Sequence, residues 1–205
     1  HGKKDIDLFR NRLQKVRLTW PQQILDILME FNVKSINDLG CNYFQLYKEI
    51  KLRKKNYNYF GYDIEKEFVK IGLKKFPELK SKHKICNIEN SRLRISDCSI
   101  ISAMLEHSDN PNKILNNLIK STKKIIIIRG YFGLNDKKSL QTKNVMRPCN
   151  HNQFSFNRIS NFFKKKKFSV NFILDKATNF SNSYKLINNN KKIKRNIYIC
   201  LATKN

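Results

Sequence analysis

The sequence has few residues that break regular structure and few that carry negative charge. Its 205 residues include 6 glycines, 4 prolines and 16 acidic residues, against 42 lysines and arginines. No apolar run approaches the ~20 residues that a membrane-spanning helix requires, which disfavours a transmembrane protein. Hydrophobic residues still make up 40% of the chain, too many for a disordered protein. We therefore expect one compact domain over residues 1–205.

Paired cysteines and metal-ligand spacings are also missing. The five cysteines are odd in number and form no Cys-x-x-Cys pair. We therefore predict reduced, buried thiols in a cytoplasmic protein, and no signal-peptide pattern opens the chain. No group of His, Cys, Asp and Glu follows the spacing of a metal site, so the sequence predicts no metal.

The net charge of +26 at pH 7 allows two interpretations. Such an excess attracts nucleic acid or anionic lipid. Heavy use of Lys, Asn and Ile with little Ala and Gly is also typical of A/T-rich coding sequence. The basic residues are dispersed, and only Lys164-Lys165-Lys166-Lys167 forms a run. We favour solvated faces, with nucleic-acid binding as the alternative.

The order of apolar segments predicts strands that alternate with helices. The expected strands cover residues 35–40, 57–63, 83–88, 98–103 and 124–129. The expected helices include two leading helices within residues 1–32, marked by Ile6, Phe9, Leu13 and Val16 and by residues 22–31, and later helices at 43–51, 65–76 and after Pro111. Strands that alternate with helices predict an α/β, Rossmann-like doubly wound sheet that is mostly parallel.

The last third, residues 133–205, has a different pattern. We expect a polar loop over 135–152 and a helix over 156–166. Two strands, at 168–174 and 196–203, are expected to form an antiparallel pair. The stretch between them is rich in Asn, Ser and Lys and is predicted to be an exposed, mobile connection.

Ligands of such sheets bind beyond the carboxyl ends of the strands, and two of the predicted strands end on suggestive residues. The first runs through Asp38 into a turn at Gly40, Cys41 and Asn42, where the chain backbone can approach a ligand. The second ends on Asp63, at the separation where a carboxylate accepts hydrogen bonds from ribose hydroxyls. Together they indicate a nucleoside cofactor.

The order of motifs over residues 33–132 resembles the class I S-adenosylmethionine-dependent methyltransferases. The motifs are Asp38-x-Gly40, Asp63, Cys86-Asn87-Ile88-Glu89 and Ala103-Met104-Leu105-Glu106-His107, followed by Asp109-Asn110-Pro111. The resemblance implies a seven-stranded sheet that closes with an antiparallel hairpin. It also implies S-adenosyl-L-methionine as the cofactor and a small-molecule or saccharide acceptor of the methyl group.

The resemblance also implies roles for individual residues. Asp38 would orient the turn, while Gly40, Cys41 and Asn42 would face the methionine portion of the cofactor. The remaining contacts would be Asp63 on the ribose, Ile64 on the adenine face, Asn87 and Ile88 along the adenine edge, and Ala103 and Met104 beside the sulfonium. The chain departs from the family at two glycine positions, which hold Asn42 and Phe44. Asn tolerates a left-handed backbone, whereas Phe44 is expected to narrow the pocket.

Further candidates lie at the mouth of the expected cleft. His107 is either a general base or a structural residue, and Glu106 either contacts cofactor or substrate or is solvated. Arg129 is placed to clamp an anionic substrate and Tyr131 to line the acceptor pocket. The next loop carries Arg147, His151 and Phe154, which we expect either to cover the site as a lid or to close off the hydrophobic core.

Two other functions stay open from the sequence. The positive charge favours an RNA methyltransferase, although the Asn/Asp-Pro-Pro-Tyr/Phe motif of base-amino methyltransferases is absent. The changes at Asn42 and Phe44 favour a catalytically inactive, methyltransferase-like binding protein. A nicotinamide-binding protein is disfavoured because only Gly40 of the Gly-x-Gly-x-x-Gly pattern is present. The oligomeric state is left open.

Overall fold

The computed structural model describes residues 17–141, 149–179, 185–188, 191–194 and 196–204. The predicted first helix and the loop residue Arg147 lie outside these ranges. In the part of the chain that is described, no helix is both long and apolar enough to cross a lipid bilayer.

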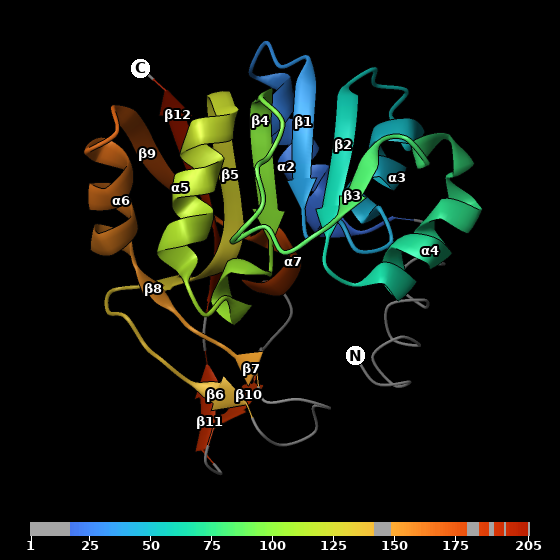
Figure 1. Cartoon of the computed structure of the whole chain (residues 1–205). Coiled ribbons are helices and arrows are strands. Elements are labelled where there is room, and N and C mark those ends of the chain that lie inside the picture. Colours follow the sequence, from blue (N-terminus) through green and yellow to red (C-terminus); the bar gives the residue numbers. More distant parts are fainter. Residues whose placement is uncertain (1–16, 142–148, 180–184, 189–190, 195, 205) are drawn as a thin grey trace.

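One sheet organises the structure, with its strands in the order β3-β2-β1-β4-β5-β12-β9 (Figure 1). The strands are β1 (Ser35–Leu39), β2 (Asn58–Asp63), β3 (His83–Ile85), β4 (Ser96–Ser102), β5 (Thr122–Gly133), β9 (Phe168–Leu174) and β12 (Ile197–Lys204). The first five pair in parallel, and β12 is antiparallel to both β5 and β9. A short eighth strand, β8 (Phe154–Ser155), pairs with the end of β5. The predicted Rossmann-like sheet with its antiparallel C-terminal pair is confirmed.

Helices cover both faces of this sheet. They are α2 (Thr19–Met29), α3 (Gln45–Leu52), α4 (Lys66–Lys75), α5 (Pro111–Ser121), α6 (Phe156–Lys164) and α7 (Lys176–Asn179), with 3-10 turns η1 (Pro77–Leu79) and η2 (Leu105–His107). One core lies under α2, α3 and α4, and a second lies under α5 and α6. Ile125 and Ile127 of β5 enter the first core, while Ile126 and Ile128 enter the second. The run of isoleucines therefore reflects a strand that is buried on both faces.

The expectation of unstructured connections in the last third is wrong in two places. The stretch after β5 contains β6 (Leu140–Gln141), which pairs with β7 (Cys149–Asn150). The stretch between β9 and β12 contains α7 and a hairpin of β10 (Lys185–Asn188) and β11 (Lys191–Lys194). Both hairpins lie beyond the carboxyl ends of the parallel strands (Figure 1). Their strands are two to four residues long, too short for an alternation of apolar residues to mark them in the sequence.

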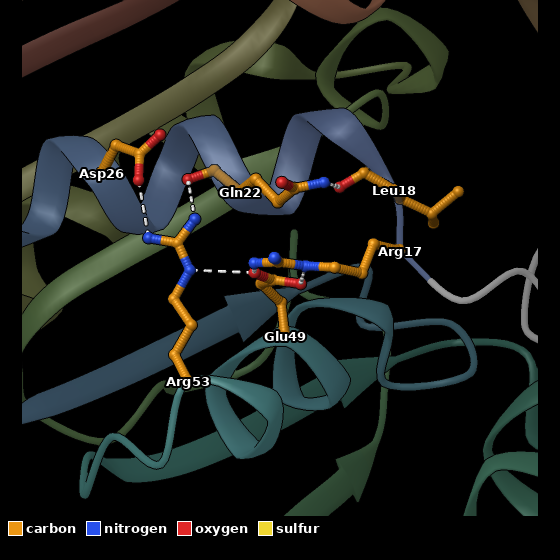
Figure 2. A network of polar contacts seen from close by, with 6 residues as sticks. All are labelled: Arg17, Leu18, Gln22, Asp26, Glu49 and Arg53. Carbon is orange, nitrogen blue, oxygen red and sulfur yellow. Dashed lines mark hydrogen bonds and ion pairs between the residues drawn. The ribbon is translucent and has the colours of Figure 1, made fainter.

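A buried carboxylate joins α2 to α3 (Figure 2). Glu49 of α3 is 2% exposed and accepts hydrogen bonds from Arg17 and, at 2.8 Å, from Arg53. Arg53 also donates to Asp26 and to the carbonyl oxygen of Gln22 on α2, at 2.6 and 3.2 Å. Burial opposes ionisation of Glu49, but the two guanidinium groups outweigh it, and its pKa lies below the ordinary value.

Replacing Glu49 with glutamine is expected to lower the free energy of unfolding by about 1–3 kcal/mol at neutral pH, because two charged hydrogen bonds lose their acceptor charge. A carboxylate with a lowered pKa stabilises the fold above its ordinary pKa of 4.5, and this contribution is lost as the pH falls through the folded value. The two proteins should therefore converge in acid. Urea denaturation at several pH values measures this difference in stability.

Glu78→Gln, which removes a surface ion pair with Lys51, is the control and should cost at most about 1 kcal/mol. Equal costs for both variants would contradict the prediction.

Candidate functional site

The turn after β1 keeps a left-handed backbone despite its lost glycines. The φ angles are +74° at Gly40, +52° at Asn42 and +59° at Phe44. The N–H groups of Gly40 and Cys41 donate to the carbonyl oxygen of Tyr62, at 2.8 and 3.0 Å. These bonds hold the turn against the end of β2. The backbone shape that glycine favours is thus preserved here by asparagine and, with some strain, by phenylalanine.

The Phe44 ring does not narrow the site as expected, because it is enclosed in the core. The side chain is fully buried and packs against two glycines. A methyl group added at Gly72 would lie 2.6 Å from the ring, and one added at Gly61 would lie 2.9 Å from it. The two glycines therefore make room for the ring, and the carboxyl edge of the sheet stays clear of it.

Asp63 joins the turn to the end of β2. Its Oδ2 accepts a hydrogen bond from the Asn42 N–H at 2.7 Å, and its Oδ1 accepts one from the Glu65 N–H at 2.9 Å. Burial raises the pKa of Asp63, and these backbone donors reduce the shift. The next residue, Ile64, is 61% exposed. A carboxylate thus lies beside an exposed apolar side chain, a pairing that suits a ribose joined to an aromatic base.

The Asp38 side chain is buried beneath the surface of the fold. It is 3% exposed, and its Oδ2 accepts a hydrogen bond from the Tyr59 hydroxyl at 2.6 Å. Burial raises the pKa of Asp38 to about 7, although the tyrosine bond favours the charged form. This carboxyl group therefore lies under the turn and is covered by the core.

The two candidates after β3, Asn87 and Ile88, differ in exposure. Asn87 is exposed, and its Oδ1 accepts a hydrogen bond from the Glu89 N–H at 2.9 Å. Ile88 is 6% exposed and belongs to the core under α5. The Ile88 side chain packs inward, whereas Asn87 presents its side chain at the surface, and the placement of both residues along the adenine edge stays a prediction.

The segment after β4 meets the turn after β1. Ala103 is exposed, has a left-handed backbone (φ +52°) and donates its N–H to the Arg129 carbonyl oxygen at 2.8 Å. Met104 packs on Gly40, where an added methyl group would lie 3.1 Å from the methionine Sδ. The structure thus brings together four of the predicted cofactor residues: Gly40, Asn42, Asp63 and Met104.

Glu106 and His107 occupy η2 and differ in their surroundings. Glu106 is 2% exposed, and in the described part of the chain its Oε2 meets no hydrogen-bond donor. Burial raises the pKa of Glu106, while the charges of His107 and Arg129 oppose the shift. His107 is exposed, and its Nδ1 lies 2.6 Å from the carbonyl oxygen of Asn150. Buried polar atoms normally have a hydrogen-bond partner, so the Glu106 Oε2 is a candidate contact for a bound molecule.

Arg129 is not placed as a substrate clamp, which corrects the expectation. Its Nε and Nη2 donate to the two carboxylate oxygens of Asp175, at 2.9 and 3.0 Å. Both side chains are buried, and the guanidinium lies 5.8 Å from the centre of the Trp20 ring. The side chain points to the α2 face of β5 and ties that strand to the residue before α7. Tyr131 is 3% exposed, with its ring centre 6.4 Å from that of His151.

The structure also assembles a group that sequence spacing did not reveal. One donor atom each of His107, Cys149 and His151 lies within 4.8 Å of the other two. The sequence shows no metal-ligand spacing, and the grouping appears only in the folded chain. Cys149 and Cys86 are half-buried, and the other three cysteines are buried. The Cys149-x-His151 spacing was the one available signal, because alternate residues of a strand face the same way.

No family model and no curated protein matches the sequence. Solved structures do match. An S-adenosylmethionine-dependent methyltransferase from Clostridium acetobutylicum ATCC 824 has a TM-score of 0.66 at 13% identity, covering 94% of each chain. Magnesium protoporphyrin IX methyltransferase from Synechocystis PCC 6803 with bound SAH has a TM-score of 0.67 at 13% identity, covering 99% of this chain and 95% of that one. DesVI from Streptomyces venezuelae scores 0.62 at 9% identity, covering 98% of each. The chain has the class I methyltransferase fold.

Proposed function

We propose that the protein is an S-adenosylmethionine-dependent methyltransferase with a small-molecule or saccharide acceptor. The observation that carries the proposal is the left-handed turn at Gly40 and Asn42, bound through the Asn42 N–H to the Asp63 carboxylate, with exposed Ile64 beside it. This arrangement lies at the carboxyl ends of the parallel strands, where sheets of this type bind ligands. The turn survives the loss of two glycines, which argues against an inactive site.

Each group has a chemical task in this proposal. The bound cofactor supplies a methyl group on a positively charged sulfur. Asp63 accepts hydrogen bonds from the ribose hydroxyls, and Ile64 packs on the adenine face. The backbone of Gly40, Cys41 and Asn42 lies along the methionine portion. Asn87 offers its amide to the adenine edge, while Ala103 and Met104 border the sulfonium.

Glu106 is our candidate for orienting the acceptor. Its Oε2 is buried without a partner in the described residues, so an acceptor hydroxyl or amine would satisfy it. Methyl transfer needs mainly correct positioning of the two reactants, which one fixed acceptor of a hydrogen bond supplies. Tyr131, whose ring centre lies 6.4 Å from that of His151, is proposed to border the same acceptor. The acceptor class is supported by the Synechocystis enzyme and by a glycopeptide N-methyltransferase of the same fold (TM-score 0.62, 7% identity).

Calorimetric titration with S-adenosylmethionine and S-adenosylhomocysteine tests the proposal. The salt concentration should be high enough to suppress nonspecific attraction to the +26 chain. We expect saturable binding of one molecule per chain. Absence of binding would overturn the proposed function and support a methyltransferase-like binding protein.

Replacing Asp63 with alanine is expected to weaken cofactor binding by about 1–3 kcal/mol, or roughly 5–150-fold, because hydrogen bonds to a charged acceptor are lost. Since Asp63 also holds the Asn42 N–H, Asp63→Asn is the second variant: it keeps an oxygen for the turn and removes the charge. The matched control is Glu67→Ala, which removes an exposed carboxylate from α4. Unchanged affinity in both Asp63 variants would contradict the ribose assignment.

A further inference from the structure

Three side chains with nitrogen or sulfur donors meet beside η2. His107 ends η2, Cys149 begins β7, and His151 follows two residues later. Their donor atoms lie within 4.8 Å of one another. The two imidazole rings meet edge to face, with their centres 4.5 Å apart and their planes at 84°. Residues from two distant parts of the chain thus converge on one point.

One backbone hydrogen bond and one side-chain hydrogen bond join the segment at β7 to η2 and to Asp109, two residues after η2. The Asn152 N–H donates to the Glu106 carbonyl oxygen at 3.0 Å. The Asn150 Nδ2 donates to the Asp109 carboxylate at 2.7 Å. Cys149 pairs with Gln141 in the β6–β7 hairpin, and the His151 N–H continues the pairing by donating to the Ser139 carbonyl oxygen at 2.8 Å. Residues two apart on such an extended segment face the same side, which applies to Cys149 and His151. The donor group is therefore built on anchored backbone segments.

His107 has the hydrogen bond that metal-binding histidines ordinarily make. Its Nδ1 lies 2.6 Å from the Asn150 carbonyl oxygen, which only accepts hydrogen bonds. Nδ1 must therefore carry the proton, and the neutral ring then has a lone pair on Nε2. A backbone carbonyl in this position orients the ring and raises the basicity of the other nitrogen.

We propose that His107, Cys149 and His151 form a binding site for a zinc ion. Two imidazoles and one thiolate are ligands that Zn²⁺ prefers, whereas Mg²⁺ and Ca²⁺ require oxygen. Zinc bonds of ~2.0–2.3 Å in tetrahedral geometry place neighbouring donors roughly 3.3–3.6 Å apart. Side-chain rotations that close the present spacing by about 1 Å would suffice. Three protein ligands leave the fourth position open, as in catalytic zinc sites.

The site lies next to Glu106, our candidate for orienting the acceptor. An ion there would offer its open position to water or to the hydroxyl or amine of the methyl acceptor. This use of the ion rests on the proposed function, whereas binding of the ion does not.

Titration of the full chain with Co²⁺, after treatment with a chelator and without cofactor, tests the site. Co²⁺ replaces Zn²⁺ in such sites and is coloured. We expect one tightly bound Co²⁺ per chain, with the visible bands of tetrahedral cobalt and a thiolate-to-cobalt charge-transfer band in the near ultraviolet. Addition of Zn²⁺ should abolish both. Because no methyl donor is present, the result does not depend on whether the protein binds that cofactor.

Three variants make the test specific. Cys149→Ser should remove the charge-transfer band and weaken binding at least 100-fold, the upper end of the ~10–100-fold cost of losing an outer partner. His107→Gln, at an exposed position, should weaken binding comparably and leave the fold intact. Cys86→Ser is the matched control at the other half-buried cysteine and should leave the spectrum unchanged.

Two results would overturn the proposal. The first is a wild-type spectrum with no thiolate band. The second is equal Co²⁺ affinity in Cys149→Ser and Cys86→Ser. Thermal unfolding of each apo variant shows whether a loss of binding comes from a loss of the fold.

Discussion

Replacing Asp175 with alanine is expected to lower the free energy of unfolding by about 3–5 kcal/mol, because it leaves a buried guanidinium without its counter-charge. Asp175 is 0% exposed and Arg129 is 6% exposed. Their two hydrogen bonds, at 2.9 and 3.0 Å, form a bidentate ion pair. Desolvation of the pair is costly, and the mutual pairing offsets that cost. Denaturation in urea measures the loss.

Two further variants distinguish the cost of a buried, unpaired charge from the cost of lost side-chain packing. The double substitution Arg129→Met and Asp175→Leu should recover most of the lost stability, since apolar side chains of similar volume often replace a buried pair. Lys51→Ala breaks an exposed ion pair with Glu78 and should cost at most about 1 kcal/mol. A double variant that is no more stable than Asp175→Ala would show that the pair itself contributes the stability.

Replacing Asp38 with asparagine is expected to stabilise the protein in mild alkali by up to ~4 kcal/mol. Burial raises the pKa of Asp38 from 3.8 to about 7, so the folded state retains a proton that the unfolded state releases. That contribution is complete below pH 3.8 and is lost as the pH rises through about 7. Asparagine resembles the protonated acid and keeps an oxygen for the Tyr59 hydroxyl. Its stability should therefore not fall over this range.

The pH dependence of urea denaturation checks this expectation, with Asp97 as a control of opposite sign. Burial of Asp97 is outweighed by hydrogen bonds from the N–H groups of Lys34 and Ser35, and its pKa is lowered. Asp97→Asn should therefore destabilise the protein at neutral pH. Parallel pH profiles for the wild type and Asp38→Asn would refute the role assigned to Asp38.

Most of the sheet could be predicted from the sequence because its strands are apolar and the helices between them repeat apolar residues at the helical period. The four isoleucines of β5 are buried on both faces, as a central parallel strand requires. The hairpins after β5 and before β12 could not be predicted in this way. Their backbone groups pair with one another, and strands of two to four residues are too short to show an apolar pattern.

The sequence predicted the part of the site that lies at the ends of individual strands. Gly40, Asn42 and Asp63 lie together because β1 and β2 are parallel neighbours whose carboxyl ends meet. Arg129 was misplaced because alternation along β5 shows that it faces opposite to Gly130, but not that Asp175 lies on that side to pair with it. Asp175, its partner, lies in a stretch that the sequence predicted to be exposed.

The sequence by itself determined the α/β class, the order of the strands along the chain and the positions of the turn residues. These features depend on the spacing of apolar residues and on glycines within short segments, which can be read without knowing the fold. Only the tertiary structure decided that Phe44 enters the core, that Arg129 pairs with Asp175, and that His107 meets Cys149 and His151. These contacts join segments far apart in the chain. Their formation depends on which faces pack together, which local sequence pattern does not specify.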